Sequence, residues 1–234
     1  MKLGIMQPYF FPYIGYWQLI NAVDKYVIYD DVNFIKGGWI NRNQILMDGE
    51  AKYINLQMRG ASPNKLIKEV ELSVDPVYNK KLLKKIESCY KNAPYYLQAF
   101  EVIEDIISQG EKNLAKYLEY AIQKVSNYLS IDTEIVISSS INKNENLKGE
   151  NKVIEICKLL GAKEYLNAIG GQKLYSYENF SKNFLELNFI KTEEIQYKQF
   201  NNQFVPNLSI IDVIMFNSKE EIDKILNTYT LVAK

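Results

Sequence analysis

Two adjacent carboxylates, Asp30 and Asp31, follow an apolar segment and are the first candidates for chemistry in this chain. A carboxylate at such a place can act as a base, accept hydrogen bonds from sugar hydroxyls or bind a cation. Because neighbouring side chains in extended backbone point to opposite sides, we expect one to enter a site and the other to brace its loop. Lys36, Asn41 and Arg42 follow in the same loop and would donate hydrogen bonds to a substrate. Arg42 would be a planar clamp for phosphate or carboxylate, and the structural alternative is an Asp31–Arg42 ion pair that only holds the loop.

A stiff aromatic segment at residues 7–16 (QPYFFPYIGY) is the second candidate, with Gln7, Tyr13, Gly15 and Tyr16 as substrate contacts. Proline and aromatic residues between a strand and a helix are typical of a pocket wall. The stretch from Tyr13 to Tyr16 resembles, in spacing and placement, the H-x-G-H signature of a nucleotidyltransferase superfamily, whose histidines contact phosphates. Tyrosine stands at both histidine positions and has no cationic form, which argues against adenylyl or cytidylyl transfer by the usual route. The alternative is plain aromatic packing.

Glycines after a later apolar segment form the third candidate, residues 167–172 (NAIGGQ). Gly170 and Gly171 follow an expected strand, where backbone N–H groups at a helix N-terminus can hold an anion or a carbonyl oxygen. Asn167 and Gln172 would add amide contacts to the same ligand. The spacing is neither that of a P-loop nor G-x-G-x-x-G, and a tight turn is the alternative explanation of the glycines. A serine run at residues 138–140 could donate to a phosphate, although serine-rich strand exits are common.

The elements that must position these residues alternate between strands and helices towards both ends of the chain. Short apolar runs predict strands, and apolar residues at helical spacing predict helices. We expect strands at residues 2–7, 25–29, 134–138, 164–167, 185–190 and 195–197, and helices at 14–23, 150–160, 209–216 and 219–226. The opening strand, helix and strand indicate a βαβ unit and a Rossmann-like, mostly parallel α/β sheet. Ligands bind beyond the carboxyl ends of such strands, where the candidate segments begin.

The middle of the chain has a different character. Asp48-Gly49 predicts a tight hairpin turn between strands at 44–47 and 52–57. Asp75-Pro76 predicts the start of a helix, and helical patterns follow at residues 77–90, 94–108 and 111–129. No repeat, low-complexity tract or linker divides the sequence. We therefore expect one α/β domain over residues 1–234, with a helical insertion at about 76–129.

The composition excludes several classes of protein. The 234 residues are 47% hydrophobic and 24% charged, which suits a folded chain with a core, and Lys+Arg equals Asp+Glu at 28 each. Without net positive charge, electrostatic binding of nucleic acid is not expected. Histidine is absent, which removes imidazole bases, Ser-His and Cys-His pairs and histidine metal ligands. Carboxylates without histidine suit only hard ions such as Mg²⁺, so the sequence names no metal site and leaves the cofactor unknown.

The sequence also carries expectations about location. Its N-terminal apolar stretch lacks the basic start and small-residue cleavage site of a signal peptide, and no run approaches the roughly 18 apolar residues of a membrane helix. We therefore expect a cytoplasmic protein that does not insert into a membrane. Cys89 and Cys157 lie far apart in helix-like apolar stretches and are expected to be free thiols, as in a reducing compartment. The oligomeric state is left open.

Three stretches together resemble the WbqC-like family of bacterial proteins. They are IMQPYFFPYIGYWQLINAVDKYVIYDDVNFIKGGWINRNQIL, KGENKVIEICKLLGAKEYLNAIGGQKLY and FVPNLSIIDVIMFNS. The resemblance runs nearly end to end and is least distinctive in the helical middle. It implies an association with surface-polysaccharide (O-antigen) gene clusters, often those that make unusual amino sugars. It implies no settled reaction and transfers no catalytic residue.

The leading hypothesis is a transferase of surface-polysaccharide biosynthesis that attaches an acyl or aminoacyl group to an amino or deoxy sugar, itself nucleotide-linked. Asp30 or Asp31 would deprotonate the sugar amine. Residues 170–171 would hold the acyl carbonyl or a phosphate, and Arg42 with Lys36 would bind the diphosphate or a carboxylate. Two alternatives remain open: a nucleotidyltransferase-like or ATP-dependent ligase in which tyrosines replace the histidines, and a non-catalytic binding protein.

Overall fold

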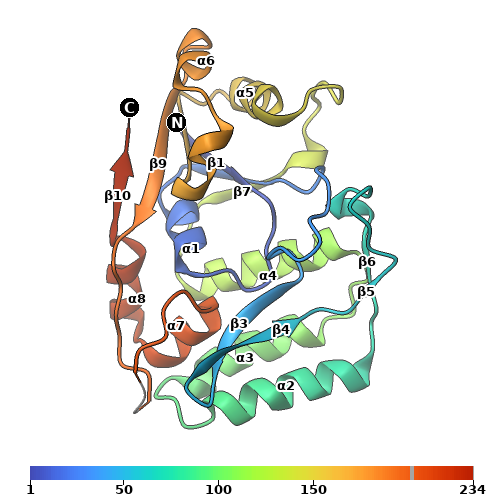
Figure 1. The fold of residues 1–234 in the computed structure, drawn as a ribbon, viewed down its shortest axis with the longest axis vertical. Coiled ribbons are helices and arrows are strands. Elements are labelled where there is room, and N and C mark those ends of the chain that lie inside the picture. Colours follow the sequence, from blue (N-terminus) through green and yellow to red (C-terminus); the bar gives the residue numbers. More distant parts are fainter. Residues whose placement is uncertain (201–202, 234) are drawn as a thin grey trace.

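A six-stranded sheet forms the centre of the computed structural model, which describes residues 1–200 and 203–233 (Figure 1). Its strands lie in the order β10–β9–β8–β1–β2–β7. Their bounds are β1 (Lys2–Met6), β2 (Lys25–Ile28), β7 (Glu134–Ile137), β8 (Glu164–Ala168), β9 (Glu186–Thr192) and β10 (Tyr229–Val232). Every neighbouring pair is parallel except β9 with β10. The mostly parallel, Rossmann-like α/β sheet expected from the sequence is therefore confirmed.

Alternate residues of the central strands enter two apolar cores, one on each face of the sheet. Tyr26 and Ile28 of β2 join the core that contains α1 (Ile14–Asn21), whereas Val27 joins the other core. The second core lies against α5 (Gly149–Leu159) and α6 (Tyr177–Lys182), through residues such as Cys157 and Phe180. This alternation is the two-residue period of extended backbone, and it explains why β1 and β2 are apolar along nearly their whole length.

The middle of the chain folds into a hairpin and three helices that flank the sheet (Figure 1). The hairpin turn is Asp48-Gly49, with φ values of 54° and 78°, as a tight turn between twisted strands requires. Its strands are β3 (Arg42–Met47) and β4 (Glu50–Asn55), and the short pair β5 (Met58–Arg59) and β6 (Glu71–Leu72) follows. The helices are α2 (Pro76–Tyr90), α3 (Tyr96–Ser108) and α4 (Leu114–Tyr128). Asp75 and Asn113 cap α2 and α4 through their side chains, as expected for such N-terminal residues.

One expectation about the last third of the chain is wrong. Residues 195–197 form no strand, because Tyr197 turns its hydroxyl to the buried carboxylate of Asp212 and this part of the chain is held by side-chain hydrogen bonds. The edge strand is instead β10, which pairs antiparallel with β9 after α7 (Ile210–Phe216) and α8 (Lys219–Leu226). Gly170 and Gly171 lie within a six-residue 3₁₀ helix, η3 (Ile169–Leu174), directly after β8.

Candidate functional site

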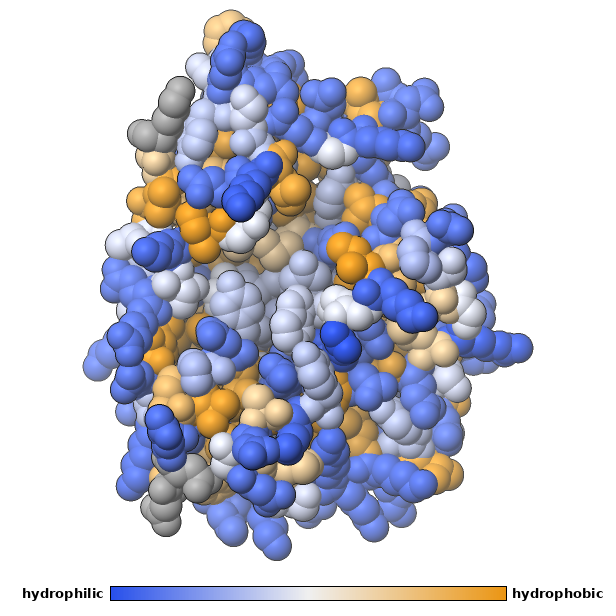
Figure 2. Space-filling model, viewed as in Figure 1, coloured by the Kyte–Doolittle hydropathy of each residue, from blue (hydrophilic) through white to orange (hydrophobic). Residues whose placement is uncertain are grey.

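Four segments begin at one edge of the sheet because β8, β1, β2 and β7 are neighbours and run in the same direction. They start at Gln7, at Tyr29, at Ser138 and at Ile169. Figure 2 shows this face of the molecule hollowed between the part that carries α5 and α6 and the part that carries β3 and β4. The carboxyl edge of a parallel sheet is where ligands bind in this class of fold.

The segment after β1 is held rigidly in an unusual conformation. Phe11 has a φ of 43°, in the left-handed region that a bulky residue rarely adopts. The Asn43 side chain on β3 donates to the carbonyls of Phe10 and Phe11 at 3.1 and 2.9 Å, and Ser209 Oγ donates to the Phe11 carbonyl at 2.8 Å. The Trp17 indole donates to the Pro12 carbonyl at 3.0 Å. Strain of this kind persists only where surrounding contacts fix it, and it clusters at functional sites.

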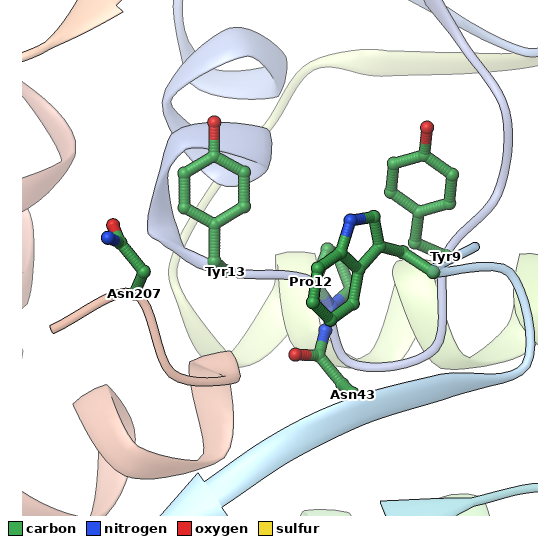
Figure 3. Close-up of a pocket in the computed structure, with 6 residues that line it drawn as sticks. Tyr9, Pro12, Tyr13, Asn43 and Asn207 are labelled. Atoms are coloured by element: carbon green, nitrogen blue, oxygen red, sulfur yellow. The ribbon is translucent and has the colours of Figure 1, made fainter. Parts of the chain in front are cut away.

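A cavity of about 330 Å³ opens beside this segment. It is lined by uncharged side chains only: Tyr9, Pro12, Tyr13, Trp39, Asn43 and Asn207. In Figure 3 the hydroxyl groups of Tyr9 and Tyr13 point to the same side. Trp39 is 44% exposed and stacks on Tyr53 with 6.3 Å between ring centroids. We call these six residues the aromatic cavity.

The tyrosines of the aromatic cavity are neutral near neutral pH. Burial raises the pKa of Tyr9 above its ordinary value, and the neighbouring Tyr13 adds to the increase. Burial also raises the pKa of Tyr13, against a smaller opposite effect of its hydrogen bond with Thr192. These phenols can therefore donate and accept hydrogen bonds, but they do not act as bases there.

The other residues of the tyrosine motif have structural contacts. Tyr16 is buried, and its hydroxyl donates to the Gln7 carbonyl at 3.1 Å. Gly15 leaves room for its neighbours, because an added Cβ would lie 2.6 Å from the Tyr13 ring and from Thr192 Oγ1. Of the two tyrosines at the histidine positions, Tyr13 lines the cavity and Tyr16 packs in the core. This arrangement differs from a pair of side chains that both face a phosphate.

The acidic pair connects the end of β2 to the end of β7. Asp30 is buried and accepts hydrogen bonds from Ser139 N and Oγ at 2.9 and 2.6 Å. Asp31 accepts a hydrogen bond from Ser138 Oγ at 2.7 Å and forms ion pairs with Lys143 at 2.8 Å and Lys152 at 3.0 Å. The two lysine side chains are only 3% and 9% exposed. The serine run thus binds the carboxylates.

The contacts of Asp31 decide its protonation. Burial works to raise the pKa of its carboxyl group, but hydrogen bonds from Lys143, Ser138 and Lys152 outweigh burial, so that the pKa lies below its ordinary value. A carboxylate in this environment is a weak base near neutral pH. The alternative interpretation of an Asp31–Arg42 ion pair is wrong, because Asp31 pairs with Lys143 and Lys152 instead. Arg42 donates to the carbonyls of Gly37 and Gly38 and lies 4.7 Å from the centroid of the Tyr53 ring.

The remaining predicted residues are spread over the same side of the fold. Lys36 and Asn41 line a separate shallow cavity beside β4 and β5, away from Asp31. Asn167 is buried, with its amide nitrogen 2.9 Å from the Tyr165 hydroxyl. Gly171 lies against Asn167, where a Cβ would come within 3.1 Å of the amide. Gly170 and Gln172 are exposed. The structure therefore gathers Gln7, Asp30, Asp31 and Asn167 at one edge and leaves Lys36, Asn41 and Arg42 elsewhere.

Several residues of this region could not be predicted from the sequence. Trp39, Asn43 and Asn207 complete the aromatic cavity from segments far from residues 7–16, and only the fold brings them together. The sequence gives one weak indication that Lys152 is buried, since it lies four residues before the buried Ile156 and so on the inner side of its helix.

Glu119 on α4 was also not predicted from the sequence. Burial, together with the nearby charge of Asp30, raises the pKa of its carboxyl group.

Residues 1–200 and 203–233 contain neither a metal-binding cluster nor a membrane-spanning helix. No group of three or more cysteine, aspartate and glutamate side chains in this part of the chain is arranged to hold a metal ion. No helix in the same residues has both the length and the apolar character needed to cross a bilayer.

The fold defines an α/β protein of the mostly parallel class, with a cavity beside the segment that follows β1. Residues 7–224 match the WbqC-like protein family, and the chain belongs to this family. The uncharacterized protein Rv1507c of Mycobacterium tuberculosis is similar to it, with 24% identity over 220 residues, which cover 92% of this chain and 93% of that protein. No solved structure matches the chain with significance.

Proposed function

We propose that this protein is a transferase of polysaccharide-related biosynthesis that attaches an acyl or aminoacyl group to an amino or deoxy sugar. Membership of the WbqC-like family supports the polysaccharide setting. In the transfer, the sugar amine attacks the carbonyl carbon of an activated acyl donor. The new C–N bond replaces the bond to the leaving group, which departs with one amine proton.

The observation that carries the proposal is the aromatic cavity. A sugar ring has apolar C–H faces that pack on aromatic rings, and hydroxyls that exchange hydrogen bonds with phenols and amides. Tyr9, Tyr13 and Trp39 offer the rings, and Asn207 offers an amide. Since no charged side chain lines the cavity, a sugar ring enters without the cost of desolvating a charged group of the protein.

The acidic pair has a different role in this proposal from the one expected from sequence. The lowered pKa of Asp31 and its two lysine partners favour a positioning role, in which Asp31 holds Lys143 and Lys152 at the end of β2. Asp30 joins the same strand end to Ser139. Neither carboxylate is assigned as the base that deprotonates the sugar amine.

The proposal is tested by binding and then by turnover. Purified protein is screened in a thermal-shift assay against dTDP- and UDP-linked amino sugars, with ATP and CTP plus Mg²⁺ as competing candidates. We expect the amino sugars to stabilise the protein. When acyl thioesters are then added, the mass of the sugar should increase by one acyl group. Stabilisation only by ATP or CTP would instead favour a ligase. A tight protein partner without any small-molecule effect would favour a non-catalytic binding protein.

A further inference from the structure

Trp39 forms a wall of the aromatic cavity although it lies on a loop that contains two glycines. The loop connects β2 to β3, and Trp39 follows Gly37 and Gly38 directly. Gly37 has a φ of 77°, a conformation that glycine adopts easily. Half-exposed side chains on such loops change rotamer within nanoseconds unless their neighbours fix them. A constant cavity wall at this place therefore needs contacts that restrain both the loop and the indole.

Arg42 restrains the backbone of this loop. Its guanidinium donates through Nε to the Gly38 carbonyl at 3.2 Å and through Nη2 to the Gly37 carbonyl. Two bonds from one planar group to consecutive carbonyls fix the chain immediately before Trp39. The Trp39 carbonyl accepts a hydrogen bond from the backbone N–H of Phe10 at 3.2 Å, which joins the loop to the segment after β1.

Tyr53 restrains the side chain of Trp39. The two rings stack with 6.3 Å between their centroids and 29° between their planes. The Arg42 guanidinium lies 4.7 Å from the centroid of the same tyrosine ring, so Tyr53 contacts both Arg42 and the indole. Tyr53 itself lies on β4, and its carbonyl accepts a hydrogen bond from Lys85 on α2 at 2.9 Å. The indole is thus connected to regular structure through two side chains.

Neighbouring residues of β3 fix two different walls of the aromatic cavity. Asn43 donates to the carbonyls of Phe10 and Phe11 and so holds the segment after β1. Arg42 points to the other side of the strand, because successive side chains alternate, and holds the loop that carries Trp39. Neither Arg42 nor the Tyr53 ring belongs to the cavity lining. Any effect of these two side chains on a ligand in the cavity passes through Trp39.

We propose that Arg42 and Tyr53 are positioning residues that hold Trp39 in the orientation that stacks on the sugar ring. The inference rests on the proposed function, because Trp39 is a wall of the cavity assigned to the sugar. A side chain that is already held in its binding conformation loses less freedom when the ligand arrives, which strengthens binding. The role of Arg42 is then indirect, whereas the sequence suggested direct contact with a phosphate or a carboxylate.

The position of Trp39 can be measured without a ligand. The chain has two tryptophans, and Trp17 is fully buried. The variant Trp39→Phe gives the fluorescence of Trp17 alone, and subtraction leaves the signal of Trp39. Acrylamide quenching then measures the exposure of the indole, and the decay of fluorescence anisotropy measures its motion. Acrylamide is neutral, so its approach does not depend on the charge of Arg42.

Two variants release the indole in different ways. Tyr53→Leu removes the stacking partner, and Arg42→Lys keeps the charge but loses the planar group that holds two carbonyls. We expect both to increase the quenching and the fast motion of Trp39. Arg42 does not stack on Trp39, so its effect cannot come from a gap beside the indole. Tyr53→Phe keeps the ring and should behave as the native protein does.

The same variants are titrated with a UDP-linked amino sugar in a calorimeter. Tyr53→Leu should weaken binding about fivefold, the size of one aromatic pair, and Arg42→Lys about threefold, the size of one exposed cation–π contact. Tyr53→Phe should restore native affinity. Tyr96→Leu is the matched control, because Tyr96 stacks on Phe100 at the same interplanar angle of 29° and does not line the cavity. It should change neither the Trp39 signal nor the affinity.

The outcomes separate this inference from the proposed function. Native quenching, motion and affinity in Tyr53→Leu and Arg42→Lys would overturn the inference while amino-sugar binding still stands. Equal changes in Tyr96→Leu would overturn it as well. If only one of the two variants behaves as the native protein does, that residue has no positioning role. Release of Trp39 in the variants of a protein that binds no amino sugar would contradict the proposed function alone.

Discussion

At the scale of single residues, ionisation and burial divide this sheet edge into two chemically distinct places. Tyr9 and Tyr13 keep their protons and form a neutral surface. Asp31 keeps its negative charge because two buried lysines bind it. A carboxylate in such a cluster contributes to stability by pairing with buried charges, and its removal leaves those charges without a partner.

We predict that Asp31→Asn lowers the free energy of unfolding by about 3 kcal/mol at pH 7, since Lys143 and Lys152 lose their shared partner. The pKa of Asp31 is lower in the folded than in the unfolded chain. Its stabilising contribution is therefore present above the unfolded value of about 3.9 and is lost as pH falls towards the folded value. The difference in free energy of unfolding between the variant and the native protein should therefore disappear as the pH drops below about 4.

Urea denaturation at a series of pH values measures this effect. Asp132→Asn, which removes the same charge from an exposed position, is the control and should change stability little. If Asp31→Asn keeps native stability but loses turnover by about 100-fold, the positioning role is wrong and Asp31 is the base.

At the scale of elements, the β1–α1 connection is the part of the fold on which the proposed function depends. Its left-handed residue, Phe11, is fixed by side chains of β3 and of the segment before α7. Tyr13 and Gly15 lie at the start of α1, where the ring of the tyrosine packs over the glycine. A change in this packing moves a wall of the aromatic cavity.

We predict that Gly15→Ala weakens binding of an amino-sugar ligand more than it lowers stability. The new Cβ would lie 2.6 Å from the Tyr13 ring, which must shift, and the ring is a wall of the cavity. Calorimetric affinity and the denaturation midpoint are measured on the same samples. Gly110→Ala, where a Cβ meets nothing within 4 Å, is the control. Equal effects of both variants on affinity would show that Gly15 does not shape the cavity.

A second element-scale prediction concerns the buried carboxylate of Asp212 at the start of α7. It accepts hydrogen bonds from Tyr90 at 2.9 Å and from Tyr197 and Gln199 at 2.6 Å each. Asp212→Leu leaves these donors unsatisfied and should cost about 3 kcal/mol of stability. Asp212→Asn keeps two acceptor directions and should cost less. Equal losses in both variants, measured by urea denaturation, would contradict this account.

The elements themselves were largely predictable from the sequence. Strands β1 and β2 are short apolar runs, the Asp48-Gly49 turn and the Asp75 cap have local signatures, and each formed as expected. The strand predicted at residues 195–197 does not form because the Tyr197 hydroxyl donates a hydrogen bond to Asp212, and a local sequence pattern does not contain such a contact. The same limit applies to the cavities, which combine residues from distant segments and were predicted only in part.

At the scale of the whole molecule, one apolar core extends from the sheet into the helical middle of the chain. Tyr26 of β2, Trp17 of α1, Ile86 of α2 and Val125 of α4 belong to the same buried cluster. Elements that share a core unfold together. The single α/β domain with a helical insertion is therefore our interpretation of the chain.

We predict one cooperative thermal transition, with equal calorimetric and van't Hoff enthalpies, when the protein is heated in a scanning calorimeter. Two separate transitions would show that the helices α2–α4 form an independent unit. Repeating the scan at several protein concentrations shows whether association contributes, because a Tm that depends on concentration indicates an oligomer.

The central claim, that the aromatic cavity holds the sugar, is tested most directly by titrating the protein with a UDP-linked amino sugar and measuring the affinity of Trp39→Ala beside it. Trp39 is half-exposed at the cavity, and its loss removes a stacking face. Leu97→Ala, an exposed apolar residue on α3, is the matched control. We predict a loss of about tenfold or more in affinity for Trp39→Ala and no change for Leu97→Ala. Unchanged affinity in Trp39→Ala would contradict the claim.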